Sequence, residues 1–326
     1  MKSGILISPD DNCRLCGHGC QARRSLGETG RCGAGREVGL SSALLHLGEE
    51  PPLSGGGLLA GGSGTIFFTR CVLGCAFCQN WQISQRPSGR DISEAELAEV
   101  MLRLEAEGAL NINLVSPTPY TVQIALALGL ARKQGLSLPV VHNSGGYDSL
   151  TALKILDGLV DIYLPDAKMA APAGVDLDEP DSRAARLLGA GDYPKVNRQA
   201  LLEMRRQVGP LQLDGRGLAR RGLLIRHLVL PDDLARTTIL LPWLAETFGP
   251  TVHLSLMAQY HPCHEVEAHP EQFRSFPGLT RHLSLREYDE VKELALKNSL
   301  LNTFVQDLAA ASHYLPDFDR PRVFIN

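Results

Sequence analysis

The chain has 326 residues, of which 44% are hydrophobic and 21% are charged, as is typical of a soluble globular protein with a sizeable core. Its formal net charge of −4 disfavours a surface that binds duplex nucleic acid. No apolar run approaches the ~20 residues that cross a bilayer, and the N-terminal apolar stretch is too short for a secretory signal. We therefore expect a cytoplasmic protein that binds neither membranes nor duplex nucleic acid.

The first 40 residues are rich in cysteine and have no sustained apolar period. They contain Cys13, Cys16, Cys20 and Cys32. A segment with so little apolar material is expected to fold around a bound metal. Zinc and a [4Fe–4S] cluster both accept four thiolates, so both remain open, and we favour iron–sulfur. We interpret His18 as an exposed loop residue rather than a ligand.

The rest of the chain predicts strands that alternate with helices. A Gly- and Pro-rich connector comes first, at residues 41–64, and we expect no regular structure from 49 to 64. Strand-like runs then occupy residues 65–70, 111–115, 138–143, 160–165, 221–230 and 251–259. Runs with a helical period occupy residues 91–108, 121–135, 149–158, 193–209, 232–248 and 286–298. Ser93 and Glu96 predict a capping box at the start of the first of these helices.

This alternation indicates an α/β fold. The strands are nearly continuous apolar runs, so we expect a parallel sheet covered on both faces. Such units form either a doubly wound sheet or a barrel-like wrap. We divide the chain into a metal-binding segment (1–40), the connector (41–64), the α/β unit (65–298) and a C-terminal extension (299–326). Residues 170–192 interrupt the spacing and are expected to form a loop that acts as a lid.

A cysteine triplet follows the first predicted strand. Cys71, Cys75 and Cys78 lie in one short loop with the spacing Cys-x3-Cys-x2-Cys. A [4Fe–4S] cluster held by three cysteines has one open iron, whereas structural zinc sites are usually closed by four protein ligands. The alternative is a zinc or four-ligand electron-transfer site that a distant side chain completes.

The triplet, with the aromatic Phe77 before its third cysteine, resembles the radical S-adenosylmethionine superfamily. Over roughly residues 42–290 the chain is similar to uncharacterised proteins related to pyruvate formate-lyase activating enzymes. The segments that carry this resemblance are HLGEEPPLSG, GSGTIFF, CQNWQIS, GALNINLVSPTP, LDGLVDIYLPDAK, RGLLIRHLVLP and LSLMAQYHP. The resemblance implies a partial (β/α)6 TIM-like barrel. It also implies that S-adenosylmethionine chelates the open iron and is cleaved reductively to a 5′-deoxyadenosyl radical.

Polar residues at the strand ends are the candidates for the cofactor pocket. Ser116 and Thr118 stand where relatives carry Gly-Gly-Glu; they offer hydroxyls, although Thr118 is also a candidate helix N-cap. Asn143 ends the third strand and is either a pocket residue or a turn residue. Phe77 is either an adenine contact or simply core.

Three charged residues follow or interrupt the later strands. Asp166 and Lys168 match the Asp-x-Lys of activating enzymes, which implies contact with the methionine end of the cofactor; the alternative is a solvated surface pair. Arg226 interrupts an apolar strand, where a charge needs a partner or a site, so we expect it to bind a carboxylate. We interpret its neighbour, His227, as structural.

The resemblance implies a low-potential electron donor of the flavodoxin or ferredoxin type. The substrate is either a glycyl radical enzyme, as for activating enzymes, or a small molecule or peptide that is modified or rearranged. A non-catalytic iron–sulfur protein is the third alternative. Tyr260, His261 and Cys263, beyond the sixth strand, are further candidates, and Cys263 is expected to be a buried bystander.

Overall fold

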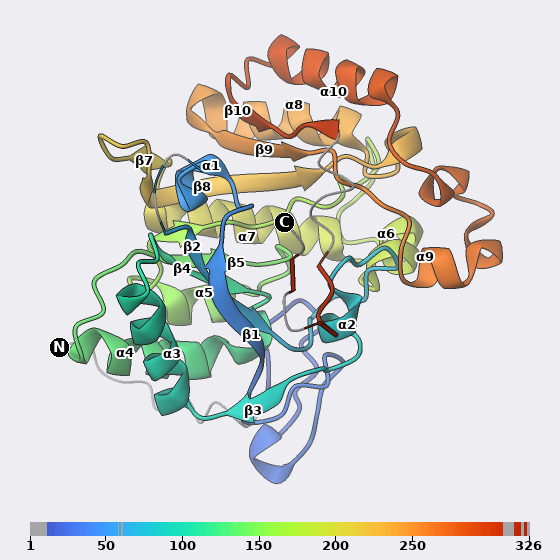
Figure 1. Ribbon diagram of the computed structural model, residues 1–326. Helices are drawn as coiled ribbons and strands as arrows, with labels where there is room; N and C mark the ends of the chain where they lie inside the picture. Colours follow the sequence, from blue (N-terminus) through green and yellow to red (C-terminus); the bar gives the residue numbers. More distant parts are fainter. Residues whose placement is uncertain (1–11, 58, 60, 309–315, 321–322, 325–326) are drawn as a thin grey trace.

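The computed structural model describes residues 12–57, 59, 61–308, 316–320 and 323–324, and so only part of the 1–40 segment and of the C-terminal extension (Figure 1). The described residues build one sheet of ten strands. The strands are β1 (Val38–His46), β2 (Ser63–Phe68), β3 (Arg90–Ile92), β4 (Ile112–Val115), β5 (Val140–Asn143), β6 (Ile162–Tyr163), β7 (Gln212–Leu213), β8 (Ala219–Leu228), β9 (His253–Met257) and β10 (Asn302–Val305).

The α-helices come between and after these strands. They are α1 (Pro51–Ser54), α2 (Trp81–Ser84), α3 (Glu94–Ala106), α4 (Thr121–Lys133), α5 (Leu150–Leu156), α6 (Ser182–Leu188), α7 (Tyr193–Val208), α8 (Thr237–Phe248), α9 (Glu265–Ala268) and α10 (Leu285–Lys297). No helix of the described chain is both long and apolar enough to traverse a bilayer.

The strand order is β10-β9-β8-β6-β5-β4-β2-β1-β3, with β7 paired to β8. The strands from β2 to β10 along this path pair in parallel, whereas β1 is antiparallel to both β2 and β3. All six predicted strands are therefore confirmed, and they lie side by side in chain order. The sheet path has two ends among the described residues, at β10 and β3, so closure toward a barrel stays a prediction.

The helical layer lies on one face of the sheet. Helices α3 and α4 pack in one core cluster with Ile66 and Leu114, and α7, α8 and α10 pack in another with Leu223 and Ile225. Register places these four strand residues on the same side of the sheet. Of the two alternatives left open by the sequence, the doubly wound sheet with helices on both faces is therefore wrong.

The opposite face, called the inner face below, is closed by shorter pieces. Leu53 of α1 packs against the apolar residues of β5, β6 and β8 on this face. Near β2, Phe318 lies 5.3 Å from Phe67, measured between ring centroids. The strands are thus buried on both sides, as their apolar composition predicts, but without a second helical layer.

Several boundaries differ from the prediction. Helix α1 forms within the predicted connector because a proline stands in its first turn, where no amide hydrogen is required. Strand β1 runs across the expected boundary between residues 40 and 41. Seven residues of the expected loop at 170–192 form helix α6, which Asp181 caps by accepting hydrogen bonds from two backbone amides. The capping box of Ser93 and Glu96 is confirmed.

Candidate functional site

The cysteine triplet lies in the loop between β2 and α2. Cys75 is buried, and Cys71 and Cys78 are partly buried; all three are free thiols. The backbone amide of Leu73 donates to Cys71 Sγ over 3.5 Å, and Cys78 Sγ lies 3.2 Å from Ser84 Oγ. The three side chains come from eight consecutive residues, so this short loop alone determines their spacing.

Burial dominates the acidity of these thiols. It raises the pKa of Cys71 to about 11, and it raises the pKa values of Cys75 and Cys78 as well. Neighbouring thiols add to this effect: Cys78 raises the pKa of both Cys71 and Cys75, and Cys71 raises that of Cys75, so the sulfurs lie within electrostatic reach of one another. The ammonium of Lys168 acts in the opposite direction and lowers the pKa of Cys75. The free thiols are therefore protonated at neutral pH, and metal binding must displace those protons.

Helix α6 braces the triplet loop. The backbone amides of Gly74 and Ala76 donate to Leu188 O and Leu187 O, both over 2.9 Å. Gly189 ends α6 at φ 73°, and a Cβ there would stand 3.3 Å from Gly74 N, so the close approach favours glycine. The segment expected to be a lid is thus tied to the triplet loop by backbone hydrogen bonds.

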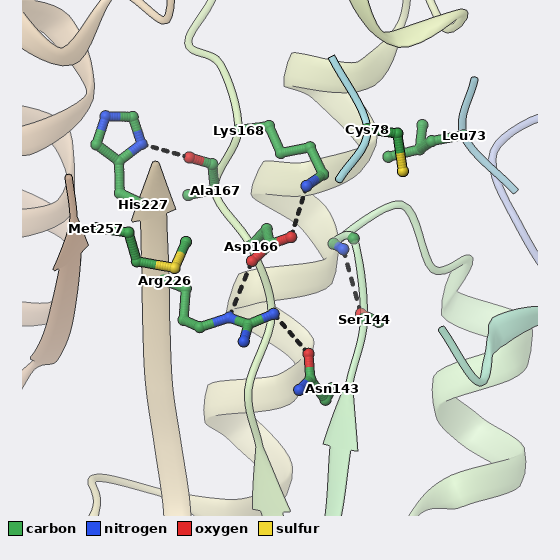
Figure 2. A network of polar contacts seen from close by, with 12 residues as sticks. Leu73, Cys78, Asn143, Ser144, Asp166, Ala167, Lys168, Arg226, His227 and Met257 are labelled. Atoms are coloured by element: carbon green, nitrogen blue, oxygen red, sulfur yellow. Dashed lines mark hydrogen bonds and ion pairs between the residues drawn. The ribbon is translucent and has the colours of Figure 1, made fainter. Parts of the chain in front are cut away.

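Asp166, Lys168, Arg226 and Asn143 form one network at the strand ends (Figure 2). Lys168 Nζ lies 2.6 Å from Asp166 Oδ2, and Arg226 Nε lies 3.0 Å from Asp166 Oδ1. Arg226 Nη2 also donates to Asn143 Oδ1 over 2.6 Å. The side chains of Lys168 and Asp166 are only 21% and 12% exposed, so the alternative of a solvated surface pair is wrong.

The charges of this network stabilise one another. Burial alone would raise the pKa of Asp166, but Lys168 and Arg226 outweigh it and hold that pKa below its usual range. Burial would likewise lower the pKa of Lys168, but Asp166 outweighs it and raises that pKa, with Cys75 adding to the effect. Lys168 is therefore a fixed ammonium between a carboxylate and the triplet.

Helix α7 contributes two residues that the sequence analysis missed. Tyr193 Oη donates to Gly145 O and Asp166 O, and Asn197 Nδ2 donates to Gly146 O and Asp166 O. These bonds join the loops after β5 and β6, and so position Asp166. The helix start at Tyr193 was visible in the sequence, but which strand-end carbonyls it meets depends on packing.

The structure places the remaining pocket candidates in different surroundings. Ser116 lies beside Cys71, whose pKa it lowers by a hydrogen bond. Thr118 does not cap α4 with its side chain; its hydroxyl donates to Asp148 Oδ1 over 2.8 Å, so the N-cap interpretation is wrong. Phe77 is buried with its ring centroid 5.8 Å from that of Tyr260, which favours a core role.

The N-terminal cysteines form a second group. Arg24 is buried among them, with Nη2 3.4 Å from Cys13 Sγ and 3.9 Å from Cys32 Sγ. Cys16 is buried, and the pKa of its thiol, raised to about 12 mainly by burial, is raised further by Cys32, Cys13 and Cys20. The four sulfurs are thus neighbours, and all are free thiols.

This segment packs against the triplet loop and the loop after β5. Cys16 forms an isolated antiparallel bridge with Asp148, which follows β5. His18 Nε2 lies 2.9 Å from Val72 O, inside the triplet loop, and its ring packs edge-on against Tyr147 at 5.0 Å. The expectation that His18 is an exposed loop residue is therefore wrong, because it is half-buried between two loops.

Within the described ranges, no three His, Cys, Asp or Glu side chains converge as the ligands of a single metal ion. Cys263 is buried, and the pKa of its thiol, raised to about 12 mainly by burial, is raised further by Cys78. It therefore lies within electrostatic reach of the triplet. His227 is held by Ala167 O and Thr237 Oγ1, at 2.6 and 2.8 Å, in keeping with the predicted structural role.

No protein-family model matches the chain. An uncharacterised protein of Methanocaldococcus jannaschii is 29% identical over 299 residues, which cover 89% of this chain and 75% of that protein. Among solved structures, SuiB of Streptococcus suis bound to the precursor peptide SuiA is 13% identical with a TM-score of 0.47; the match covers 76% of this chain and 50% of SuiB. The enzyme anSMEcpe with bound AdoMet and a peptide is 12% identical with a TM-score of 0.45, over 72% of this chain and 60% of its own. The chain thus spans about half to three-fifths of the solved chains that it matches, and at these TM-scores neither likeness determines its chemistry.

Proposed function

We propose that the protein is a radical S-adenosylmethionine enzyme and that Cys71, Cys75 and Cys78 hold its [4Fe–4S] cluster. The observation that carries this proposal is the placement of three free thiols from one loop beside the fixed ammonium of Lys168. A cluster with three cysteine ligands keeps one iron open, which suits a cofactor that chelates through its amino and carboxylate groups.

The residues present fit such a cluster. Each thiolate of a [4Fe–4S] cluster binds a different iron, so its ligands need not converge on one point as single-ion ligands do. The described side chains include no such convergent set around the triplet. When bound, the cluster and cofactor supply the reductive cleavage that yields a 5′-deoxyadenosyl radical for hydrogen-atom abstraction.

The chain's own residues then bind and orient the cofactor. Lys168 presents its ammonium toward the triplet and binds the cofactor carboxylate, while Asp166 keeps that ammonium in place. Arg226 anchors Asp166 and Asn143, so side-chain contacts join three neighbouring strands at this edge. Ser116 contributes its hydroxyl beside Cys71. Thr118 acts through Asp148, and Phe77 supports the triplet loop by packing, so neither side chain is a direct cofactor contact in this proposal.

For the substrate, we infer a glycyl radical enzyme as the first candidate, with a small molecule or peptide as the alternative. A flavodoxin- or ferredoxin-type protein would supply the electron. Incubation with deuterated candidate substrates distinguishes the two classes of substrate, because hydrogen-atom abstraction transfers deuterium from the true substrate into 5′-deoxyadenosine. A glycyl radical detected by electron paramagnetic resonance selects the first candidate, and label from a small molecule or peptide selects the second.

The N-terminal cysteines are a second metal site in this proposal. The mutual proximity of the four sulfurs supports it, and the buried Arg24 can donate to two of them as it would to metal-bound thiolates. A cluster suits these cysteines better than zinc, because their side chains do not converge as tetrahedral zinc requires.

The experiment that tests the proposed function is anaerobic reconstitution with iron and sulfide, followed by reduction with S-adenosylmethionine present. We expect an electron paramagnetic resonance signal that the cofactor changes, together with release of 5′-deoxyadenosine. A fully loaded, reduced protein that released no 5′-deoxyadenosine would instead be a non-catalytic iron–sulfur protein.

A further inference from the structure

Two adjacent glutamates lie under the cofactor network and have no role in the function proposed above. Glu49 and Glu50 join β1 to α1, and the chain turns there across the inner face of the sheet. The side chain of Glu49 is only 9% exposed, and its Oε2 lies 3.9 Å from Arg226 Nη1. Burial raises the pKa values of both carboxyls, although Arg226 opposes the effect at each.

The charges around this pair do not balance. Arg226 and Lys168 supply two positive charges, whereas Asp166, Glu49 and Glu50 supply three carboxylates. His46 is the nearby basic group, with Nδ1 3.8 Å from Glu49 Oε1, but burial lowers its pKa to about 4, so it is neutral at pH 7. A carboxylate that is buried without a counter-charge is costly, so the site requires a further cation or a proton.

Unpartnered polar atoms face the same place. Asn113 is fully buried and lies beside Glu49, whose pKa it lowers, yet neither its amide nitrogen nor its amide oxygen completes a hydrogen bond with the described residues. Glu50 Oε2 and His46 Nδ1 likewise complete no hydrogen bond within the described ranges, although His46 Nδ1 lies 3.8 Å from Glu49 Oε1. Two of these atoms, Glu50 Oε2 and Asn113 Oδ1, are acceptors, which a ligand with hydrogen-bond donors would satisfy.

Register places this group on the face that carries the cofactor network. Asn113 pairs with Val141 in β5, two residues before Asn143, and Arg226 pairs with Ser255 in β9. Ser255 lies beside Glu50, whose pKa it lowers. Side chains two residues apart on a strand share a face, so Asn113, Asn143, Arg226 and Ser255 all project to the inner side.

We propose that Glu49, Glu50 and Asn113 form the subsite for a positively charged group of the substrate, an ammonium or a guanidinium. This proposal rests on the proposed function, because it takes the cation to belong to that enzyme's substrate. The cation supplies the charge that Arg226 and Lys168 leave lacking, and its N–H groups donate to the unpartnered oxygens of Glu50 and Asn113. Arg226 links the two ends of the site, because it contacts Glu49 on one side and Asp166 on the other.

The test uses the full-length chain and small probes at constant ionic strength. Butylammonium and N-methylguanidinium are the cationic probes, and 1-butanol and N-methylurea are their neutral counterparts. At ten times its dissociation constant, a bound probe raises the melting temperature by roughly 2 °C. We expect a saturable rise with a cationic probe and none with its neutral counterpart.

The variants are Glu49→Gln, Glu50→Gln and the double variant, which remove charge but keep shape; Glu246→Gln, on the exposed side of α8, is the matched control. We expect at least ten-fold weaker probe binding in the double variant and unchanged binding in the control. The proposal is overturned if the wild-type protein shows no preference for cationic probes, or if the double variant binds them as tightly as the wild type. Either result would mean that the Glu49 and Glu50 pair is neutralised by a bound proton instead of a cation. The proposed function is tested separately, by measuring whether the wild-type protein releases 5′-deoxyadenosine in the absence of substrate.

Discussion

Arg226 of β8 holds Asp166, which follows β6, with 3.0 Å between Nε and Oδ1, and the same guanidinium holds Asn143 of β5. Three neighbouring parallel strands are therefore joined by side chains at the edge where they end (Figure 2). Lys168 extends this network toward the cysteine triplet, and Glu49 extends it across the inner face of the sheet. A substitution in the network is thus expected to affect both ends of the site.

The first prediction concerns the cluster ligands. Cys75→Ala removes one of three ligands from the loop, so we expect loss of the cluster and of cofactor cleavage from a protein that remains folded. Iron and sulfide analysis measures the first effect, and chromatography of 5′-deoxyadenosine measures the second. Cys263→Ala is the matched control, since Cys263 lies near Cys78 but outside the triplet loop. The triplet assignment fails if a protein lacking Cys71, Cys75 and Cys78 keeps its full iron content and its activity.

The second prediction concerns Lys168. If its ammonium binds the cofactor carboxylate, Lys168→Ala weakens cofactor binding by about 1.5–3 kcal/mol, as expected for a charged hydrogen bond. Anaerobic calorimetry on reconstituted protein measures the dissociation constant. Lys297→Ala, on the exposed end of α10, should leave it unchanged. An unaltered dissociation constant in Lys168→Ala would exclude the pocket role.

The third prediction concerns pH and His46. Burial lowers the pKa of His46 to about 4 from an ordinary value of 6.5, so the unfolded chain takes up a proton between these values while the folded chain does not. Acidification from pH 7 to pH 5 therefore destabilises the fold, by about 2 kcal/mol for this group. His46→Gln should remove that part of the pH dependence. Urea titrations at the two pH values measure the free energy of unfolding. The same change in that free energy between pH 7 and pH 5 in both proteins would contradict the assignment.

The fourth prediction concerns the loop after β5. Gly146 has φ 70°, and a Cβ there would stand 2.2 Å from Asp166 O and 2.3 Å from Asn197 Nδ2. Gly146→Ala should therefore destabilise the protein by about 1–3 kcal/mol and displace Asp166. Gly129→Ala, inside α4 with no atom within 4 Å of the added methyl group, should instead stabilise it by about 0.5–1 kcal/mol. Thermal unfolding of the two variants compares them, and equal shifts would argue against a conformational requirement at Gly146.

The fifth prediction concerns the second metal site. Cys13→Ala/Cys16→Ala should lose the N-terminal metal and become sensitive to protease in that segment, while the α/β unit stays folded, because metal binding and folding are coupled. Mild oxidation of wild-type protein should remove the triplet's cluster first, since one of its irons is open. Iron with sulfide in the segment supports electron relay, and zinc alone makes the site structural. A segment that resists protease without metal would show that its cysteines only pack.

The amino-acid sequence by itself determined the local features of this protein. Hydrophobic period located the six strands and the helices between them, and the capping box of Ser93 and Glu96 marked the start of α3, because these signals act over a few residues. The spacing of Cys71, Cys75 and Cys78 is equally local, since one loop carries all three.

Only the tertiary structure decided which side chains meet. The sequence marked the pair Asp166 and Lys168 and, separately, Arg226. Strand register joins Arg226 to this pair, and packing from α7 positions Asp166 through Tyr193 and Asn197. Glu49 and Glu50 looked like part of a connector, and their burial became visible only once α1 was placed across the inner face. Contacts of this kind join residues from 27 positions apart, as for Tyr193 and Asp166, to 177 apart, as for Glu49 and Arg226. Their energies come from burial and charge in an environment that no short stretch of sequence contains.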